Sequence, residues 1–242
     1  MEETGFSNGF VVAAVLYLLF RLFRRKRRRK RKSYSSQSTV DDVLVKGELG
    51  EKRLLAALEV FEKHGAKVLS NLYIPKTNDE ETTEVDAVLI HRKGFFVFEA
   101  KNYSGWIFGN EKNKYWTQTL AVGRGRRSQR ERFYNPLRQN GTHIAHLKRM
   151  LSKSVPMYSI IVFSNNCELK DITVSPNKTY KITQQRSLVD LIEQILSDTK
   201  EDVFTEEDVE WMYDELAAFA DVDEETKRRH IEQQQLAQEK NR

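Results

Sequence analysis

The stretch TEVDAVLIH, residues 83–91, is followed by Arg92-Lys93-Gly94 and then by FFVFEAK, residues 95–101. Both segments are rich in β-branched and aromatic residues, and a three-residue connection that contains glycine is typical of a β-hairpin. Residues two apart share one face of a strand, so Glu99 and Lys101 should lie on the same face. The stretch therefore predicts two paired strands that carry a charged cluster.

A third charged residue, Asp86, lies on the first of these strands and can meet Glu99 and Lys101 across the pair. Two carboxylates that converge beside a lysine suit a hard divalent cation, because such ions prefer oxygen ligands. Metal-assisted phosphodiester hydrolysis needs these parts, since the lysine can position water or stabilise developing charge. The alternative is a solvated strand face with an ordinary ion pair, and the spacing alone favours that alternative.

The chain around the hairpin alternates helical and β-rich segments, which predicts an α/β or α+β fold with a mixed sheet flanked by helices. Two of the later helices are expected to begin with capping boxes, at Ser187 and at Thr205. In chain order, the expected elements are a helix within 41–64 closed by Gly65, a strand at 66–74, the hairpin, strands within 105–120, a helix from Asn135-Pro136 to about Lys153, strands at 157–164 and around 179–183, and the two capped helices.

Charge is distributed unevenly along the 242 residues, which include 40 basic and 35 acidic side chains. Ten of the basic and two of the acidic residues fall within 1–32, so the remaining 30 basic and 33 acidic residues give the body a charge of −3. The basic character therefore belongs to one short tract. The chain has a single cysteine, Cys167, which excludes internal disulfides and which we interpret as structural.

That tract, residues 24–32 (RRKRRRKRK), follows the apolar run FVVAAVLYLLFRLF at residues 10–23. Positive charge after an apolar segment matches the positive-inside rule for a single-pass anchor whose N-terminus is outside and whose body is cytoplasmic. Residues 5–32 would then contact membrane lipid. The alternative is an amphipathic or nucleic-acid-binding basic arm. The predicted organisation is an anchor with its basic tract at 1–32, a linker at 33–40, an α/β domain with C-terminal helices at 41–220 and a polar tail at 221–242.

The charged residues of the hairpin belong to a series of four motifs along the chain. These are, in order, Gly50-Glu51, Asp86, Glu99-Ala-Lys-Asn-Tyr-Ser-Gly105, and Asn135-Pro136 through Gln139. In these motifs the sequence resembles the nuclease-related domain (NERD) family, a branch of the PD-(D/E)XK restriction-endonuclease-like superfamily. The resemblance covers roughly residues 45–165. It implies a restriction-endonuclease-like mixed sheet of four strands with helices on both sides.

The resemblance also implies a catalytic set. Asp86 and Glu99 would bind Mg²⁺ or Mn²⁺, and Lys101 would serve the attacking water. Glu51 would reach the site from the first helix, with Glu48 as the competing residue, and Gln139 would reach it from the later helix.

A segment with five arginines, GRGRRSQRERF at residues 123–133, is expected to be a loop that contacts nucleic-acid phosphates. Its arginines are Arg124, Arg126, Arg127, Arg130 and Arg132. Nearby aromatic residues, Trp106, Tyr115 and Trp116, would stack on unpaired bases. His143 and His146 lack evident partner ligands in the sequence, so we interpret them as ordinary core or surface histidines.

Together these observations predict a membrane-anchored, cytoplasm-facing nuclease-like protein that hydrolyses DNA or RNA phosphodiesters with a divalent metal, DNA being the favoured substrate. The competing hypothesis is a catalytically inactive nuclease-fold module that binds nucleic acid or protein at the membrane. In a third hypothesis the basic tract tethers nucleic acid or anionic lipid and the domain is regulatory.

Overall fold

The computed structural model describes residues 49–76, 81–120, 128–151, 155–176 and 179–220, and the single residues 222, 225 and 228. The predicted anchor and linker therefore lie outside the described residues, as do Arg124, Arg126 and Arg127. Among the residues that are described, no helix combines the length and the apolar character needed to cross a membrane. The N-terminal transmembrane helix stays a prediction.

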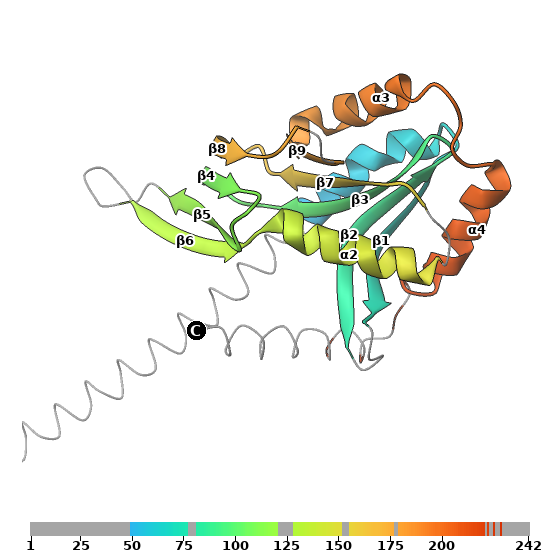
Figure 1. Ribbon diagram of the computed structural model, residues 1–242, viewed down its shortest axis with the longest axis horizontal. Coiled ribbons are helices and arrows are strands. Elements are labelled where there is room, and N and C mark those ends of the chain that lie inside the picture. Colours follow the sequence, from blue (N-terminus) through green and yellow to red (C-terminus); the bar gives the residue numbers. More distant parts are fainter. Residues whose placement is uncertain are drawn as a thin grey trace, which may run out of the picture. The chain divides into compact units, whose positions relative to one another are not determined.

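The main sheet has five strands in the order β1-β2-β3-β7-β9 (Figure 1). Its strands are β1 (Lys67–Pro75), β2 (Thr82–His91), β3 (Gly94–Lys101), β7 (Met157–Phe163) and β9 (Tyr180–Gln184). The predicted hairpin is confirmed, because β2 and β3 are antiparallel and His91 lies opposite Gly94. β3 pairs with β7, and β7 with β9, in parallel. The sheet is thus mixed, as predicted, with one strand more than the family resemblance implied.

A second sheet of four strands extends from the end of β3, in the order β6-β5-β4-β8. It contains β4 (Gly105–Asn110), β5 (Tyr115–Leu120), β6 (Gln129–Tyr134) and β8 (Cys167–Thr173). Two of these strands were not predicted. The prediction of a loop was wrong for the residues of β6, because they pair with β5. In this strand Phe133 packs against Tyr103 and Trp116. β8 was missed because its residues are mostly exposed and charged.

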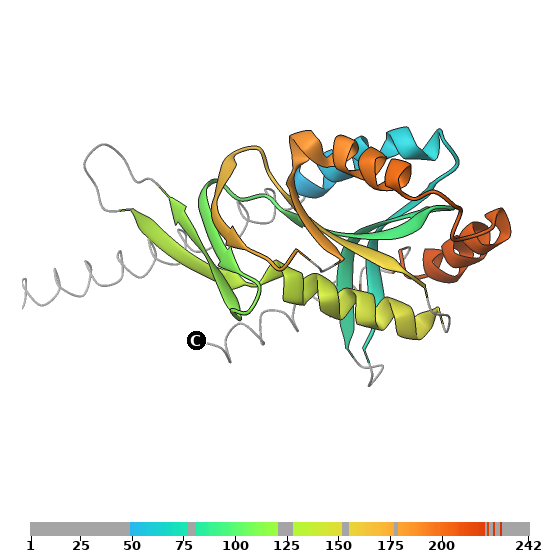
Figure 2. The ribbon, with the colours of Figure 1, turned by 45° about the horizontal axis from the view of Figure 1, so that its top comes forward.

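Helices cover both faces of the main sheet, as predicted (Figure 2). The first helix, residues 49–62, and α3 (Leu188–Asp198) pack on the face that carries Phe96 and Phe98. α2 (Pro136–Met150) and α4 (Glu206–Ala217) pack on the opposite face, which carries Phe95 and Val97. The two-residue periodicity of β3 thus supplies two separate apolar cores.

Of the two capping boxes expected from the sequence, one is confirmed. The Thr205 side chain accepts from the Asp208 backbone N–H, and the Asp208 carboxylate accepts from the Thr205 N–H. Ser187 makes no such bond, because a short 3₁₀ helix, Gln185–Ser187, leads directly into α3. The backbone there is already turning, so no side-chain cap forms at Ser187.

The buried residue Asn135 fixes the start of α2. Its side-chain oxygen accepts the Leu137 N–H, and its Nδ2 donates to the carbonyl groups of Asn110, Glu111 and Asn113 at 3.4, 3.1 and 2.7 Å. One amide therefore caps the helix and also holds the turn between β4 and β5. This explains the Asn-Pro pair structurally: proline supplies the first helical residue, and asparagine links α2 to the second sheet.

Candidate active site

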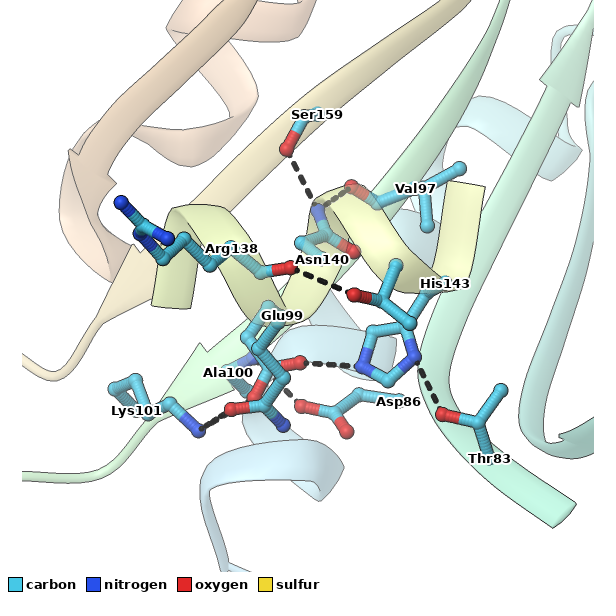
Figure 3. A network of polar contacts seen from close by, with 12 residues as sticks. Thr83, Asp86, Val97, Glu99, Ala100, Lys101, Arg138, Asn140, His143 and Ser159 are labelled. Atoms are coloured by element: carbon cyan, nitrogen blue, oxygen red, sulfur yellow. Dashed lines mark hydrogen bonds and ion pairs between the residues drawn. The ribbon is translucent and has the colours of Figure 1, made fainter. Parts of the chain in front are cut away.

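Charged and polar side chains from three elements meet near the end of β3 (Figure 3). Asp86 comes from β2, Glu99 and Lys101 from β3, and Gln139 from α2. The paired residues of β2 and β3 end at Ala87 and Phe98. Beyond that point the Asp86 carboxylate takes the place of a backbone partner, since its Oδ2 accepts the Ala100 N–H at 2.7 Å. The end of the β2–β3 pairing is therefore what brings Asp86 to the site.

Glu99 is only 1% exposed, and both of its carboxylate oxygens have partners. Lys101 Nζ donates to Oε1 at 2.5 Å, and His143 Nε2 lies 3.1 Å from Oε2. Lys101 Nζ also donates to the side-chain oxygen of Gln139 at 3.2 Å. Lys101 therefore joins the strand carboxylate to α2 through two hydrogen bonds.

The environment moves the pKa values of the two carboxyls in opposite directions. Burial, together with the neighbouring charge of Glu99, holds the pKa of Asp86 well above its usual range. Burial also acts to raise the pKa of Glu99, but Lys101 and the hydrogen bond from His143 outweigh it and bring that pKa below its usual value. Without a cation, the surroundings therefore favour the ionised form of Glu99 and oppose that of Asp86.

Lys101 is the cation of the cluster. Burial acts to lower its pKa, but the negative charge of Glu99 and the hydrogen bond to that carboxylate act in the other direction and leave the pKa above its usual value. Lys101 is thus an ammonium ion at neutral pH. In this arrangement it can donate hydrogen bonds and stabilise negative charge, but it has no lone pair with which to accept a proton.

The first helix approaches the site from the face of the sheet opposite α2. Gly50 lies close to Asn102, the residue that directly follows β3. A Cβ placed on Gly50 would stand 3.0 Å from the Cβ of Asn102. The next residue, Glu51, is near enough for its charge to contribute to the raised pKa of Asp86. The glycine therefore allows the close approach that brings Glu51 toward the cluster. Glu48 lies outside the described residues.

The structure brings together Asp86, Glu99, Lys101 and Gln139, and it places Glu51 near enough to act on Asp86 electrostatically. The part played by His143 was not predicted. This residue is buried, as expected of a core histidine, but its ring contacts Glu99 on one side and Thr83 on the other. A signal was present, since His143 follows Gln139 by four residues and so shares its helix face.

Of the residues predicted to contact nucleic acid, the structure describes Arg130 and Arg132, and both are exposed on β6. Trp106 shares their face of the second sheet, because it lies opposite Thr119, which lies opposite Arg130. It is 49% exposed. The stacking role expected for Trp116 was wrong: its side chain is buried on the inner face, stacked on Phe163.

The donor set suits a divalent cation that is held by two carboxylates and keeps water as its other ligands. In the described part of the chain, no three His, Cys, Asp or Glu side chains are arranged to hold a metal together. Asp86 and Glu99 offer two carboxylates, which suits Mg²⁺, an ion that is usually bound by one or two carboxylates and keeps several waters. The opposed ionisation of Asp86 is also what a cation between the two carboxyls would relieve.

The family model described as nuclease-related domain matches residues 46–164. A Bacillus anthracis protein, described as uncharacterized, is 29% identical over 186 residues, which cover 77% of this chain and 82% of that protein. No solved structure matches the chain.

The raised pKa of Asp86 predicts that Asp86→Asn stabilises the metal-free protein at neutral pH. The amide oxygen can still accept the Ala100 N–H, while the buried negative charge is removed. A group whose folded pKa is raised contributes stability below its unfolded pKa of about 3.9, and that contribution is lost as the pH rises through the folded pKa. The advantage of the variant should therefore be small near about pH 4 and largest near about pH 8.

Thermal melts in the presence of a chelator would measure this difference, and a gain of ~1 kcal/mol corresponds to a rise of about 2–4 °C in a chain of this size. Asp171→Asn is the matched control, since Asp171 is exposed on β8. A melting temperature of Asp86→Asn that stays below the wild-type value from pH 4 to pH 8 would contradict the raised pKa of Asp86.

Proposed function

Because residues 46–164 of this chain are a nuclease-related domain, we propose that the protein is a metal-dependent phosphodiesterase that hydrolyses DNA or RNA, with DNA as the favoured substrate. The observation that carries the proposal is the placement of two carboxylates, half-buried Asp86 and buried Glu99, beside one lysine at the end of β3. In such an arrangement each carboxyl disfavours the ionisation of the other. It is therefore expected at a site that binds a cation rather than at one that only stabilises the fold.

In the proposed reaction, Asp86 and Glu99 would hold Mg²⁺ or Mn²⁺. The bound ion would supply Lewis-acid polarisation of a phosphate oxygen and a lowered pKa of its water. Lys101, as an ammonium ion, would donate a hydrogen bond to the attacking water or to the charge that develops on phosphorus-bound oxygens. It would not remove the proton itself, because its raised pKa keeps all three of its hydrogens in place.

Two residues from the flanking helices would support this set. Gln139 accepts from Lys101 Nζ at 3.2 Å and would keep the ammonium aimed into the site. Glu51 lies close enough to act on Asp86 electrostatically and would add negative charge on the side of the first helix. Both roles are matters of position, since neither side chain is required to gain or lose a proton.

The competing function is a catalytically inactive module that binds nucleic acid or protein. Converging carboxylates repel phosphate, so a module that only binds nucleic acid has no use for Asp86 and Glu99 at its contact surface. The complete set of acidic residues and the retained Lys101 therefore favour the enzyme.

Cleavage of single- and double-stranded DNA and RNA in Mg²⁺ and in Mn²⁺ tests the proposal. Asp86→Asn and Glu99→Gln should abolish cleavage and metal binding measured by calorimetry. Lys101→Ala should retain metal binding and lose about 10²-fold or more in rate, the scale expected for one preorganised electrostatic group. Lys67→Ala is the matched control, because Lys67, on β1, forms an exposed ion pair with Glu210 on α4.

Two outcomes would decide against the enzyme. Undiminished cleavage by Asp86→Asn would remove this carboxylate from the mechanism. A wild-type protein that cleaves none of the four substrates with either metal would leave the binding module as the better function.

The nucleic acid would be contacted by the outer face of the second sheet, where Arg130, Arg132 and Trp106 are exposed. Cations lie over aromatic rings on this face: the Arg132 guanidinium is 4.8 Å from the Tyr115 ring centroid, and Lys170 Nζ is 5.5 Å from that of Trp106. The positive charge suits phosphates, and the aromatic rings beside it suit unpaired bases. Glu168, which pairs with Lys170, offsets part of this charge.

Replacing Arg130 and Arg132 together with alanine should weaken nucleic-acid binding with little dependence on sequence. It should also lower the slope of log affinity against log salt by up to ~1.8 units if each residue contacts one phosphate. Binding is measured in chelator, so that cleavage does not interfere. Arg92→Ala is the control, since Arg92 is an exposed arginine in the turn between β2 and β3. An unchanged slope would exclude β6 from the contact surface.

The proposed location of the protein is the membrane, with residues 5–32 contacting lipid and the body in the cytoplasm. The apolar run at 10–23 and the basic tract at 24–32 support this proposal. The full-length protein should sediment with membranes and resist extraction by both carbonate and 1 M salt, which reduces the electrostatic screening length to ~3 Å. Release by salt alone would instead indicate electrostatic attachment through the basic tract.

A further inference from the structure

Thr83, His143 and Glu99 form a chain of contacts that leads from β2 through α2 to the site (Figure 3). The Thr83 hydroxyl oxygen is 2.9 Å from His143 Nδ1, and His143 Nε2 is 3.1 Å from Glu99 Oε2. Their exposed fractions are 8%, 4% and 1%. Buried polar groups of this kind form networks whose members fix one another's orientation.

The direction of each hydrogen bond follows from the groups present. Glu99 already accepts from the Lys101 ammonium through Oε1 at 2.5 Å, and a carboxylate paired with an ammonium can only accept. His143 must therefore carry hydrogen on Nε2. In the neutral ring Nδ1 then has a lone pair, so Thr83 Oγ1 donates to it. The Glu99 carboxylate thus selects the ring tautomer that donates to it, and the threonine hydroxyl satisfies the other ring nitrogen and holds the ring in place.

The position of the His143 ring is itself fixed by α2. Asn140 lies about one helical turn before His143. Its Nδ2 donates to the Val97 carbonyl and to Ser159 Oγ, both at 2.9 Å. These bonds hold α2 against β3 and β7 at one register. His143 is carried by the same helix, so its ring cannot shift along β3 without breaking them.

The contacts on Glu99 are also divided between its two oxygens. Lys101 binds Oε1 and His143 binds Oε2, so the plane of the carboxylate is fixed at two points. A glutamate side chain otherwise rotates freely about its terminal bond. Each carboxylate oxygen has more than one acceptor position, so these two contacts leave capacity for a further partner.

We propose that His143, with Thr83 behind it, is a positioning residue that orients the Glu99 carboxylate toward a divalent cation. This inference rests on the proposed function, because it gives the buried chain a purpose only if Glu99 is a metal ligand. It adds two residues that neither the sequence motifs nor the predicted catalytic set include.

The test uses the full-length protein and two pairs of variants. Thr83→Val removes the hydroxyl and keeps the shape of the side chain, whereas Thr83→Ser keeps the hydroxyl. His143→Leu removes the donor to Glu99, whereas His143→Gln retains an amide donor. Thermal melts confirm that each variant folds, and if His143→Leu does not fold, the Thr83 pair decides.

Two quantities are measured, Mg²⁺ affinity by calorimetry and the ring tautomer of His143 by nitrogen-15 NMR in the metal-free protein. We expect the wild type to hold hydrogen on Nε2, the tautomer that donates to Glu99, and the ring to be less firmly held in Thr83→Val. Its Mg²⁺ affinity should fall about 10-fold or more, the scale observed when a residue that orients a ligand is removed. Thr83→Ser and His143→Gln should remain close to the wild type in affinity.

The possible failures are distinct. If Thr83→Val and His143→Leu bind Mg²⁺ as tightly as the wild type while Asp86→Asn loses binding, the inference is overturned and the site assignment stands. A neutral wild-type ring with hydrogen on Nδ1 would also overturn it. If Asp86→Asn binds Mg²⁺ like the wild type, the proposed function itself fails, and the inference fails with it.

Discussion

The structure around the candidate site depends on one electrostatic constraint: half-buried Asp86 and buried Glu99 share one site, where each negative charge opposes the ionisation of the other carboxyl. Lys101 relieves this for Glu99, and the Ala100 N–H partly relieves it for Asp86. One ammonium ion cannot balance both carboxylates, and the raised pKa of Asp86 is the result. A protein selected for stability alone would gain by replacing one of the two, so their retention is best explained by a function.

Helix α2 links this constraint to the rest of the fold. It begins at the Asn135 cap, which also holds the β4–β5 turn, and Asn140 fastens it to β3 and β7. Gln139 and His143 are carried between these attachments to Lys101 and Glu99. The short run from Asn135 to His143 therefore combines fastening and positioning residues, which explains why asparagine, glutamine and histidine occur on the buried side of one helix.

The second sheet contributes two faces with different roles. Its inner face carries Trp116 and Phe133, which pack with Phe163 and Tyr103 and so support the end of β3. Its outer face carries Arg130, Arg132 and Trp106, and is the part of the described surface that best suits nucleic acid. Alternation along β5 and β6 separates a packing function from a proposed binding function within the same strands.

The helices on both faces of the main sheet were expected from the family resemblance. The sequence alone determined the hairpin of β2 and β3 and the grouping of Asp86, Glu99 and Lys101, because two-residue alternation and turn residues are local signals. It did not reveal β6 and β8, whose exposed, charged residues look like loops and become strands only through pairing with β5 and β4. Nor did it reveal that Trp116 is buried or that His143 binds Glu99. Those facts depend on which helix face and which sheet face meet in space, and long-range packing decides that after the local elements have formed.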